Sequence, residues 1–257
     1  MGNISAIFSK EMRSYFGSPI AYVMAGVFLL ICGFAFRNEV LQFHDLFVFL
    51  ERSEHTEREQ MNVNQAVVEA FFNWQAFIWT IVTPMLTMRL YAEEKRIGTY
   101  ELLATSPLTN WQILMGKFLA CFTLYVLMEV AALSFIGLLS QYARIEWGPV
   151  FSGALGTLLL GATFISVGIL GSSLTENQIV AVVLSFFMLL MLWTIDWSAR
   201  YAGDALGQIL WYLSIPAHTR DMIRGVVYTN DIVFFLSVTV FFLFVAHTGI
   251  ESRRWRQ

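Results

Sequence analysis

The sequence is short of charged residues and of cysteine. Asp, Glu, Lys and Arg make up 14% of the 257 residues, whereas soluble proteins contain about 25%. A soluble domain of this length needs a charged exterior, which this composition does not supply. The two cysteines, Cys32 and Cys121, lie in apolar runs and form no CxxC pair, which is typical of core residues rather than of disulfides or metal ligands. These deficits exclude a disordered chain, a disulfide scaffold and a nucleic-acid-binding protein, and they indicate a polytopic membrane protein.

The sequence also lacks the residue patterns of an enzyme. A nucleotide-binding loop needs GxxxxGK[ST] to hold phosphates, but the single Gly-Lys pair, Gly116-Lys117, is followed by Phe118 inside an apolar run. The four histidines lie far apart, and no Ser-His or Asp-Asp constellation is visible from the spacing. We therefore expect no catalytic, cofactor-binding or metal-binding residues on this chain.

Long hydrophobic runs are what the sequence does contain. A helix needs about 20 apolar residues to cross about 30 Å of hydrocarbon. Runs that are continuously apolar over 18 or more residues favour helices over barrel strands. The fold class expected is an all-α polytopic membrane protein with six transmembrane helices. The runs cover residues 19–36, 68–88, 112–140, 150–171, 178–195 and 231–249.

The distribution of Lys and Arg predicts the orientation, because cytoplasmic loops carry an excess of both residues. With a cytoplasmic N-terminus, nine of the 16 Lys and Arg residues lie in or beside the inner segments, including all three lysines. Six acidic residues gather in residues 37–59 on the other side. We therefore expect both termini to be cytoplasmic and the segments 37–67 and 196–230 to be outer loops.

Residues 1–18 precede the first apolar run and have the pattern of an amphipathic helix in the inner membrane interface. Gly17 and Pro19 then turn the chain into the membrane. The alternative is a frayed polar tail. The apolar face is expected to carry Ile4, Phe8, Met12 and Tyr15, and the polar side Ser5, Ser9, Lys10 and Arg13.

Both long outer loops contain more apolar residues than a solvated loop needs. In residues 37–67 an apolar first half is followed by the polar stretch ERSEHTEREQ. This pattern suits either a short helix that lies on the membrane or docks a partner, or a loop with buried anchors. Residues 196–230 predict two short helices before the last span, re-entrant or interfacial, with a loop anchored by aromatic residues as the alternative.

The inner segment 89–111, RLYAEEKRIGTYELLATSPLTNW, carries its charges in its first half. Gly98 permits a bend, and Thr99 can cap a short following helix. Pro107 and the capping box Thr109-x-x-Gln112 mark the start of the next helix. The predicted order is helix, bend, short helix, turn and membrane helix. Mixed charges of this kind suit a docking surface, with a solvated turn as the alternative.

The stretch GTYELLATSPLTNWQILMGKFLA resembles the inner loop of ABC-2 type transporter permeases. The stretches KEMRSYFGSPIAYV and DIVFFLSVTVFFLFVAHTGIESRRWRQ are similar to the gliding-motility-type branch of that family. The outer loop 37–67 is longer than in many members. The resemblance implies a single transmembrane domain over residues 1–257. It also implies that the segment 93–103 rests on a separate ATPase. The ATPase-coupling residues it suggests are Glu93, Glu94, Lys95, Arg96, Gly98, Thr99, Tyr100, Glu101, Leu102 and Pro107.

The same resemblance implies the setting of the protein. We expect a permease subunit of an exporter in the inner membrane of a bacterium, with a cytoplasmic P-loop ATPase dimer that holds ATP and Mg²⁺. A second copy or a related permease completes the membrane part, and a membrane-anchored periplasmic auxiliary protein is a further partner suggested. The alternative is a complex that does mechanical or assembly work on a cell-surface machine without moving a soluble substrate.

Three of the polar residues inside the predicted spans are candidates for a function. Glu129 lies near the middle of the third run, where a charge is costly unless it is paired, protonated or facing a polar cavity. It either lines a conduit or senses protons, or it hydrogen-bonds a neighbouring helix. Asn73 and Gln75 lie near the outer end of the second run, where they line a vestibule or, with Trp74 and Trp79, anchor the interface.

Overall fold

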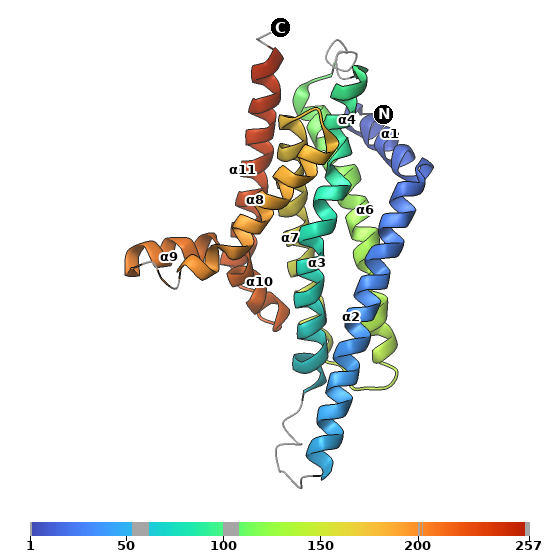
Figure 1. Ribbon diagram of the computed structural model, residues 1–257, viewed down its shortest axis with the longest axis vertical. Helices are drawn as coiled ribbons and strands as arrows, with labels where there is room; N and C mark the ends of the chain where they lie inside the picture. Colours follow the sequence, from blue (N-terminus) through green and yellow to red (C-terminus); the bar gives the residue numbers. More distant parts are fainter. Residues whose placement is uncertain (1, 53–61, 100–107, 200, 202, 255–257) are drawn as a thin grey trace.

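The computed structural model describes residues 2–52, 62–99, 108–199, 201 and 203–254, and within these ranges it is helical without strands (Figure 1). Both termini lie at one end of the bundle, which we call the terminal end; the other is the opposite end. The elements are α1 (Asn3–Gly17), α2 (Pro19–Arg52), the π-helical turn η2 (Asn64–Val68), α3 (Glu69–Thr87), α4 (Arg89–Ile97), α6 (Asn110–Leu139), α7 (Trp147–Leu174), α8 (Gln178–Ala199), α9 (Asp204–Leu213), α10 (Ile215–Ile223) and α11 (Thr229–Arg254).

Six helical segments of the described chain are long and apolar enough to cross a membrane, which confirms the predicted all-α polytopic fold. Each contains one of the predicted apolar runs or most of it. The segments are Pro19–Leu50, Asn64–Ile97, Asn110–Leu139, Trp147–Leu174, Gln178–Ser198 and Thr229–Ser252.

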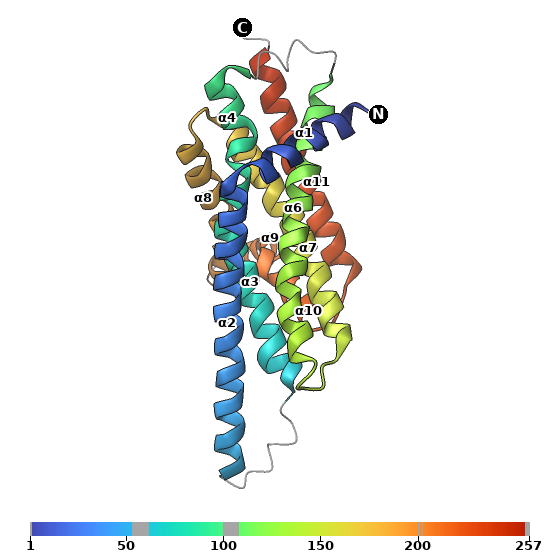
Figure 2. The same ribbon diagram turned by 90° about the vertical axis from the view of Figure 1, so that its right-hand side faces the viewer.

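The first span is longer than predicted, and the boundary of the outer loop at residue 37 is wrong. Residues 37–52 continue α2 as one helix, because this stretch contains no Gly or Pro to end it. Phe43 and Phe47, four residues apart, stack with ring centroids 6.4 Å apart. At 1.5 Å per residue, the 34 residues of α2 span about 51 Å. Its end therefore projects beyond the rest of the bundle (Figure 2).

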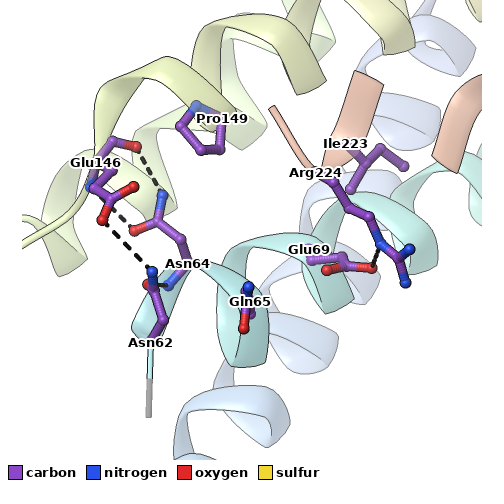
Figure 3. Close-up of a pocket in the computed structure, with 8 residues that line it drawn as sticks. All are labelled: Asn62, Asn64, Gln65, Glu69, Glu146, Pro149, Ile223 and Arg224. Carbon is purple, nitrogen blue, oxygen red and sulfur yellow. Dashed lines mark hydrogen bonds and ion pairs between the residues drawn. The ribbon is translucent and has the colours of Figure 1, made fainter. Parts of the chain in front are cut away.

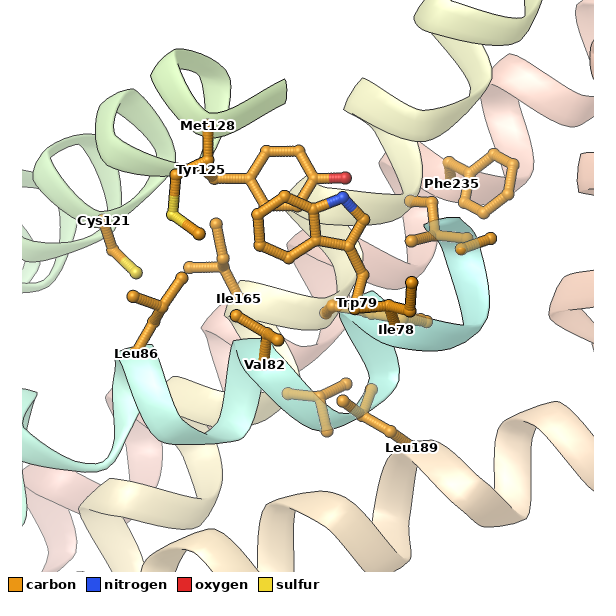
Figure 4. Close-up of a cluster of buried hydrophobic side chains, with 14 of the residues drawn as sticks. Ile78, Trp79, Val82, Leu86, Cys121, Tyr125, Met128, Ile165, Leu189 and Phe235 are labelled. Carbon is orange, nitrogen blue, oxygen red and sulfur yellow. The ribbon is translucent and has the colours of Figure 1, made fainter. Parts of the chain in front are cut away.

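Helix α7 lies at the centre of the bundle, and its small residues let neighbouring helices approach closely. A Cβ added at Gly161 would lie 2.2 Å from Cζ of Tyr125, and one at Gly168 would lie 2.1 Å from Oγ1 of Thr87. Tyr125 in turn packs on Trp79, with ring centroids 4.0 Å apart, inside the buried cluster of Figure 4. The small residues of the fourth span thus form the contact surface for α3 and α6.

Two short helices precede the last span, as predicted. Helix α9 points away from the bundle, while α10 turns back onto it (Figure 1). Ser152 of α7 donates a 2.6 Å hydrogen bond to the carbonyl of Met222 in α10. Buried His218 lies 2.7 Å from Asp231 and stacks on Phe234. These contacts join α10 to α7 and α11; the depth of α9 in a bilayer stays a prediction.

Candidate functional site

Helix α1 lies against α6 near the terminal end. Ile7 and Glu11 are buried against the bundle, whereas Ile4 of the predicted apolar face is exposed. The placement of that face in the membrane interface stays a prediction. Gly116 of α6 allows the contact, since a Cβ there would lie 2.7 Å from Cβ of Ile7. Glu11 determines which face of α1 turns toward the bundle, because its partner Lys117 lies on α6. Phe8 and Met12 are half-buried, and Lys10 and Arg13 are exposed.

Four charged residues from α1, α4 and α6 meet at this contact, and we call them the ion cluster: Lys10, Glu11, Glu94 and Lys117. Nζ of Lys117, only 1% exposed, lies 3.0 Å from Oε1 of Glu11 and 2.8 Å from Oε1 of Glu94. It also donates a 2.6 Å hydrogen bond to the carbonyl of Leu90. Nζ of Lys10 lies 2.6 Å from Glu94 and 3.2 Å from Glu11. Two positive and two negative groups thus balance at the junction of three helices.

The neighbouring charges of the ion cluster favour the ionised forms of Glu11 and Lys10. Burial by itself would raise the pKa of Glu11, but Lys117 and Lys10 outweigh it and lower that pKa below its ordinary 4.5. Burial would lower the pKa of Lys10, but its hydrogen bond to Glu94 and the two carboxylates raise that pKa above 10.5. Both shifts favour the paired, charged state.

A side chain of α7 inserts into the junction between α3 and α4. The hydroxyl of Ser172 accepts hydrogen bonds from the backbone N–H groups of Tyr91 and Ala92, each 3.1 Å long. It donates one of 2.9 Å to the carbonyl of Met88. An inserted side chain of this kind interrupts the helical ladder. Lys95 donates to the carbonyl of Ser173, so α4 is attached to the end of α7 as well as to α6.

Most of the described charged residues that were expected to dock a partner instead form contacts within the molecule. Glu94 is buried in the ion cluster. Glu93 pairs with Arg89, whose Nε lies 2.8 Å from its Oε2. Arg96 and Ile97 are exposed.

The predicted bend and restart of the chain after α4 are confirmed. Gly98 ends α4 with a positive φ of 76°, which favours glycine. Thr99 donates back to the carbonyl of Glu94 over 3.4 Å. The capping box at Thr109 and Gln112 starts α6, with bonds of 3.3 and 3.2 Å. The predicted short helix with Tyr100, Glu101 and Leu102, and the turn at Pro107, lie outside the described residues.

The second polar centre, the Glu129 site, lies inside the bundle. Glu129 is 1% exposed. Its Oε2 accepts hydrogen bonds from Nε2 of Gln75 at 2.8 Å and Nε1 of Trp79 at 3.0 Å. Its Oε1 lies 2.8 Å from the hydroxyl of Thr157. Donors from α3 and α7 thus converge on one carboxyl of α6, which is the arrangement of the neighbouring-helix alternative.

The two polar residues predicted in the second span, Asn73 and Gln75, differ in their surroundings. Asn73 is exposed and donates to the carbonyl of Glu69 in its own helix over 2.8 Å, whereas Gln75 points into the core. Trp79 is fully buried, so its assignment to an interfacial aromatic belt is wrong. It packs between Phe28 and Tyr125, and its indole N–H is satisfied by Glu129.

A comparison with known protein families finds a match for most of the chain. Residues 51–246 match the family described as "ABC-2 family transporter protein". The chain belongs to this family. No curated protein matches the chain. Membership shows a permease subunit of an ABC transporter, a membrane domain that works with an ATPase subunit.

At its opposite end the permease holds a polar pocket of about 380 Å³ (Figure 3). Asn64 binds the backbone of Glu146 on both sides, donating to its carbonyl at 2.7 Å and accepting from its N–H at 3.0 Å. Nε of Arg224 lies 2.9 Å from Oε1 of Glu69. These contacts join the start of α3 to the loops before α7 and α11.

Sequence reasoning missed several residues that organise the permease: Glu11, Lys117, Thr157 and Ser172. Lys117 offered a signal, because it is the one lysine within a predicted apolar run, and a charge there requires a partner. Glu11 offered a signal too, because it is a charged residue on the same helical face as the apolar residues Phe8 and Tyr15. Thr157 and Ser172 carry no local signal beyond their small size.

Proposed function

We propose that this permease subunit belongs to an ATP-driven exporter whose separate ATPase subunits dock at the tip of α4. The observation that carries the proposal is the construction of α4. Buried contacts tie this helix to α1, α6 and α7, while its tip, Arg96 to Thr99, faces outward. The chain carries no nucleotide-binding loop of its own, so ATP and Mg²⁺ bind on the partner ATPase.

The ties of α4 determine how a push on its tip would travel. Glu94 is held by Lys117 of α6, and the backbone of α4 is held by Ser172 of α7. A displacement of the tip by closing ATPase domains therefore moves α6 and α7 with it. Packed elements of this kind switch between discrete arrangements rather than deform continuously. Gly98 allows the following segment to turn away from α4 without strain.

The proposal also includes the membrane in which the permease lies and its membrane partner. The excess of Lys and Arg in the inner segments supports cytoplasmic termini in the inner membrane of a bacterium. Helices α2 and α8 are the least buried of the spans, which supports a second permease, identical or related, as a membrane partner. The coupling residues Tyr100, Glu101, Leu102 and Pro107 remain part of the proposed docking segment.

A mechanical or assembly role without a soluble substrate is the second candidate. The projecting end of α2 supports it (Figure 2), because Leu41, Leu46 and Phe49 are exposed along it. A membrane-anchored periplasmic protein would find an apolar helix there. The likeness to the gliding-motility-type branch points the same way.

The test uses the tagged full-length chain, purified in mild detergent with identification of what co-purifies. We expect a P-loop ATPase in stoichiometric amount. The double variant Arg96→Glu/Ile97→Asp should lose it while the chain keeps its thermal stability, because both side chains are exposed. Arg13→Glu, an exposed charge reversal on α1, is the matched control and should retain the ATPase. Equal ATPase recovery with all three chains would overturn docking at α4.

Reconstituted vesicles then separate the two candidate functions. ATP turnover that accumulates a solute supports the exporter. Stimulated turnover without transport, together with co-purification of a periplasmic protein that is lost when Leu46 and Phe49 are changed to Ser, supports the machine.

A further inference from the structure

A groove of about 330 Å³ runs along the outside of the bundle between α2 and α3. It is far more apolar than the pocket of Figure 3. One end is walled by Ile31 of α2 and by Ile81 and Val82 of α3. Its volume falls within the range of sites that hold drug-sized ligands, about 300–1,000 Å³. The groove is therefore large enough to hold part of a long, flexible ligand such as an acyl chain.

The other end of the groove is polar. Asn38, Glu39 and Gln42 of α2 line it together with Trp74 of α3. Nε1 of Trp74 donates a 3.0 Å hydrogen bond to Oε1 of Glu39, which fixes the carboxylate at the groove. This bond uses one oxygen of Glu39, a residue that lines the groove. The groove thus combines an apolar wall with one oriented carboxylate and two amides.

The spacing along α2 matches the thickness of a bilayer. Pro19 begins the helix at the terminal end. At 1.5 Å per residue, Ile31 lies about 18 Å along the axis, Asn38 about 28 Å and Gln42 about 35 Å. The hydrocarbon layer is about 30 Å thick. With Pro19 at the edge of that layer, the apolar end of the groove would lie among acyl chains. Its polar end would lie at the level of the head groups, where tryptophan is also enriched.

We propose that this groove binds a lipid of the bilayer that carries a primary ammonium in its head group, with one acyl chain along the apolar wall. The carboxylate of Glu39 attracts an ammonium and repels a purely anionic head, and the amides of Asn38 and Gln42 can bind the phosphate or ester oxygens beside it. Nothing in this assignment depends on export or on ATPase docking. It concerns which lipid the outer half of the α2–α3 face retains.

The test uses the full-length chain in detergent, loaded with phosphatidylethanolamine or phosphatidylglycerol of identical chains and measured by native mass spectrometry. We expect the ethanolamine lipid to be retained preferentially. Glu39→Gln keeps an acceptor for Trp74 but removes the charge. It should weaken retention of that lipid about tenfold, the size of one hydrogen bond to a charged group, and so remove the preference.

A second pair of variants tests the groove itself. Ile81→Trp fills the apolar end and should abolish retention of both lipids. Val240→Trp places the same bulk on exposed α11, away from the groove, and should behave like the unchanged chain. Equal retention of the two lipids by the unchanged chain would overturn the proposal, as would identical behaviour of the two Trp variants. A dimer that excludes lipid and dissociates on Ile81→Trp would assign the groove to a second copy instead.

Discussion

The permease buries carboxylates in two ways, and the ion cluster and the Glu129 site show the difference. In the ion cluster, Glu11 and Glu94 face two lysines, and the group of four is electrically balanced. In the Glu129 site, a single carboxyl faces donors that are all neutral among the residues the structure describes. A buried charge without a counter-charge is costly, so the two sites solve the same problem by different chemistry.

The hydrogen-bond geometry shows how the Glu129 site can do without a counter-charge. The hydroxyl of Thr157 has one hydrogen, yet it lies 2.8 Å from Oε1 of Glu129 and 3.0 Å from the carbonyl of Ala154. A protonated Glu129 would donate to Thr157, which would then donate to Ala154, so that the hydroxyl and both oxygens of Glu129 are satisfied. The ion cluster offers no such neutral arrangement, because Lys117 contacts both carboxylates and a carbonyl. Paired charges join the helices at the terminal end, whereas the geometry of the Glu129 site allows a neutral network of hydrogen bonds.

The largest effect is expected from Lys117→Met. It removes the buried one of the two lysines that Glu11 and Glu94 share, which should lower the free energy of unfolding by about 3–5 kcal/mol. Thermal unfolding in detergent measures the loss, and limited proteolysis should show that α1 is released. Lys10→Met is the control, because the Lys10 side chain is 54% exposed and should cost less than about 1 kcal/mol. Similar losses for the two lysines would contradict a buried core to the cluster.

A smaller effect is expected at Glu129, and it should depend on the replacement. Glu129→Leu leaves the buried donors of Gln75 and Trp79 without an acceptor and should cost about 1–3 kcal/mol. Glu129→Gln can accept from Gln75 and Trp79 through its oxygen and donate to Thr157 through its amide, so it should cost less than about 1 kcal/mol. The comparison of the two unfolding midpoints decides. A Glu129→Gln variant as unstable as Glu129→Leu would show that this site, too, requires a charge.

Full transport by Glu129→Gln in reconstituted vesicles would limit the residue to a structural role. Loss of transport at unchanged stability would indicate that it lines a conduit or carries a proton.

The smallest effect is the pH dependence contributed by Glu11. Its pKa in the folded protein is below the ordinary 4.5 because of Lys117 and Lys10. The unfolded state therefore binds the proton first as pH falls, and the stabilisation, complete above about pH 5, is lost below pH 4.5. Unfolding midpoints at pH 7, 5 and 4 measure it. The Glu11→Gln variant removes the titrating group and should show a shallower fall than the unchanged chain; parallel curves would rule out this contribution.

The parts of the fold that could be predicted depend on local patterns. Six apolar runs predict six spans because bilayer thickness sets their length, and the capping box at Thr109 is complete within four residues. The end of α2 was missed because a bilayer-length rule stops at residue 36, although no helix-breaking residue follows until well beyond it.

The parts that were missed depend on distant pairs. Lys117 and Glu11 are 106 positions apart, and the inserted hydroxyl of Ser172 lies 80 or more positions from the backbone it binds. No pattern within a helix predicts which buried face meets which partner. For the same reason, Gln75 and Asn73, two residues apart, could not be assigned to opposite sides without knowing where Glu129 lies.

The separation of Glu11 from Lys117 also has a consequence for biosynthesis. Chains are made at about 5–20 residues per second, so the 106 positions between the two residues take about 5–20 s to synthesise. During that interval two spans are completed while Glu11 still lacks Lys117, its buried partner. The half-buried Phe8 and Met12 give the waiting helix an apolar side with which to rest on the membrane surface. Insertion of the third span then brings Lys117 next to Glu11. The contact between the N-terminal helix and α6 therefore forms only after the first two spans have been made.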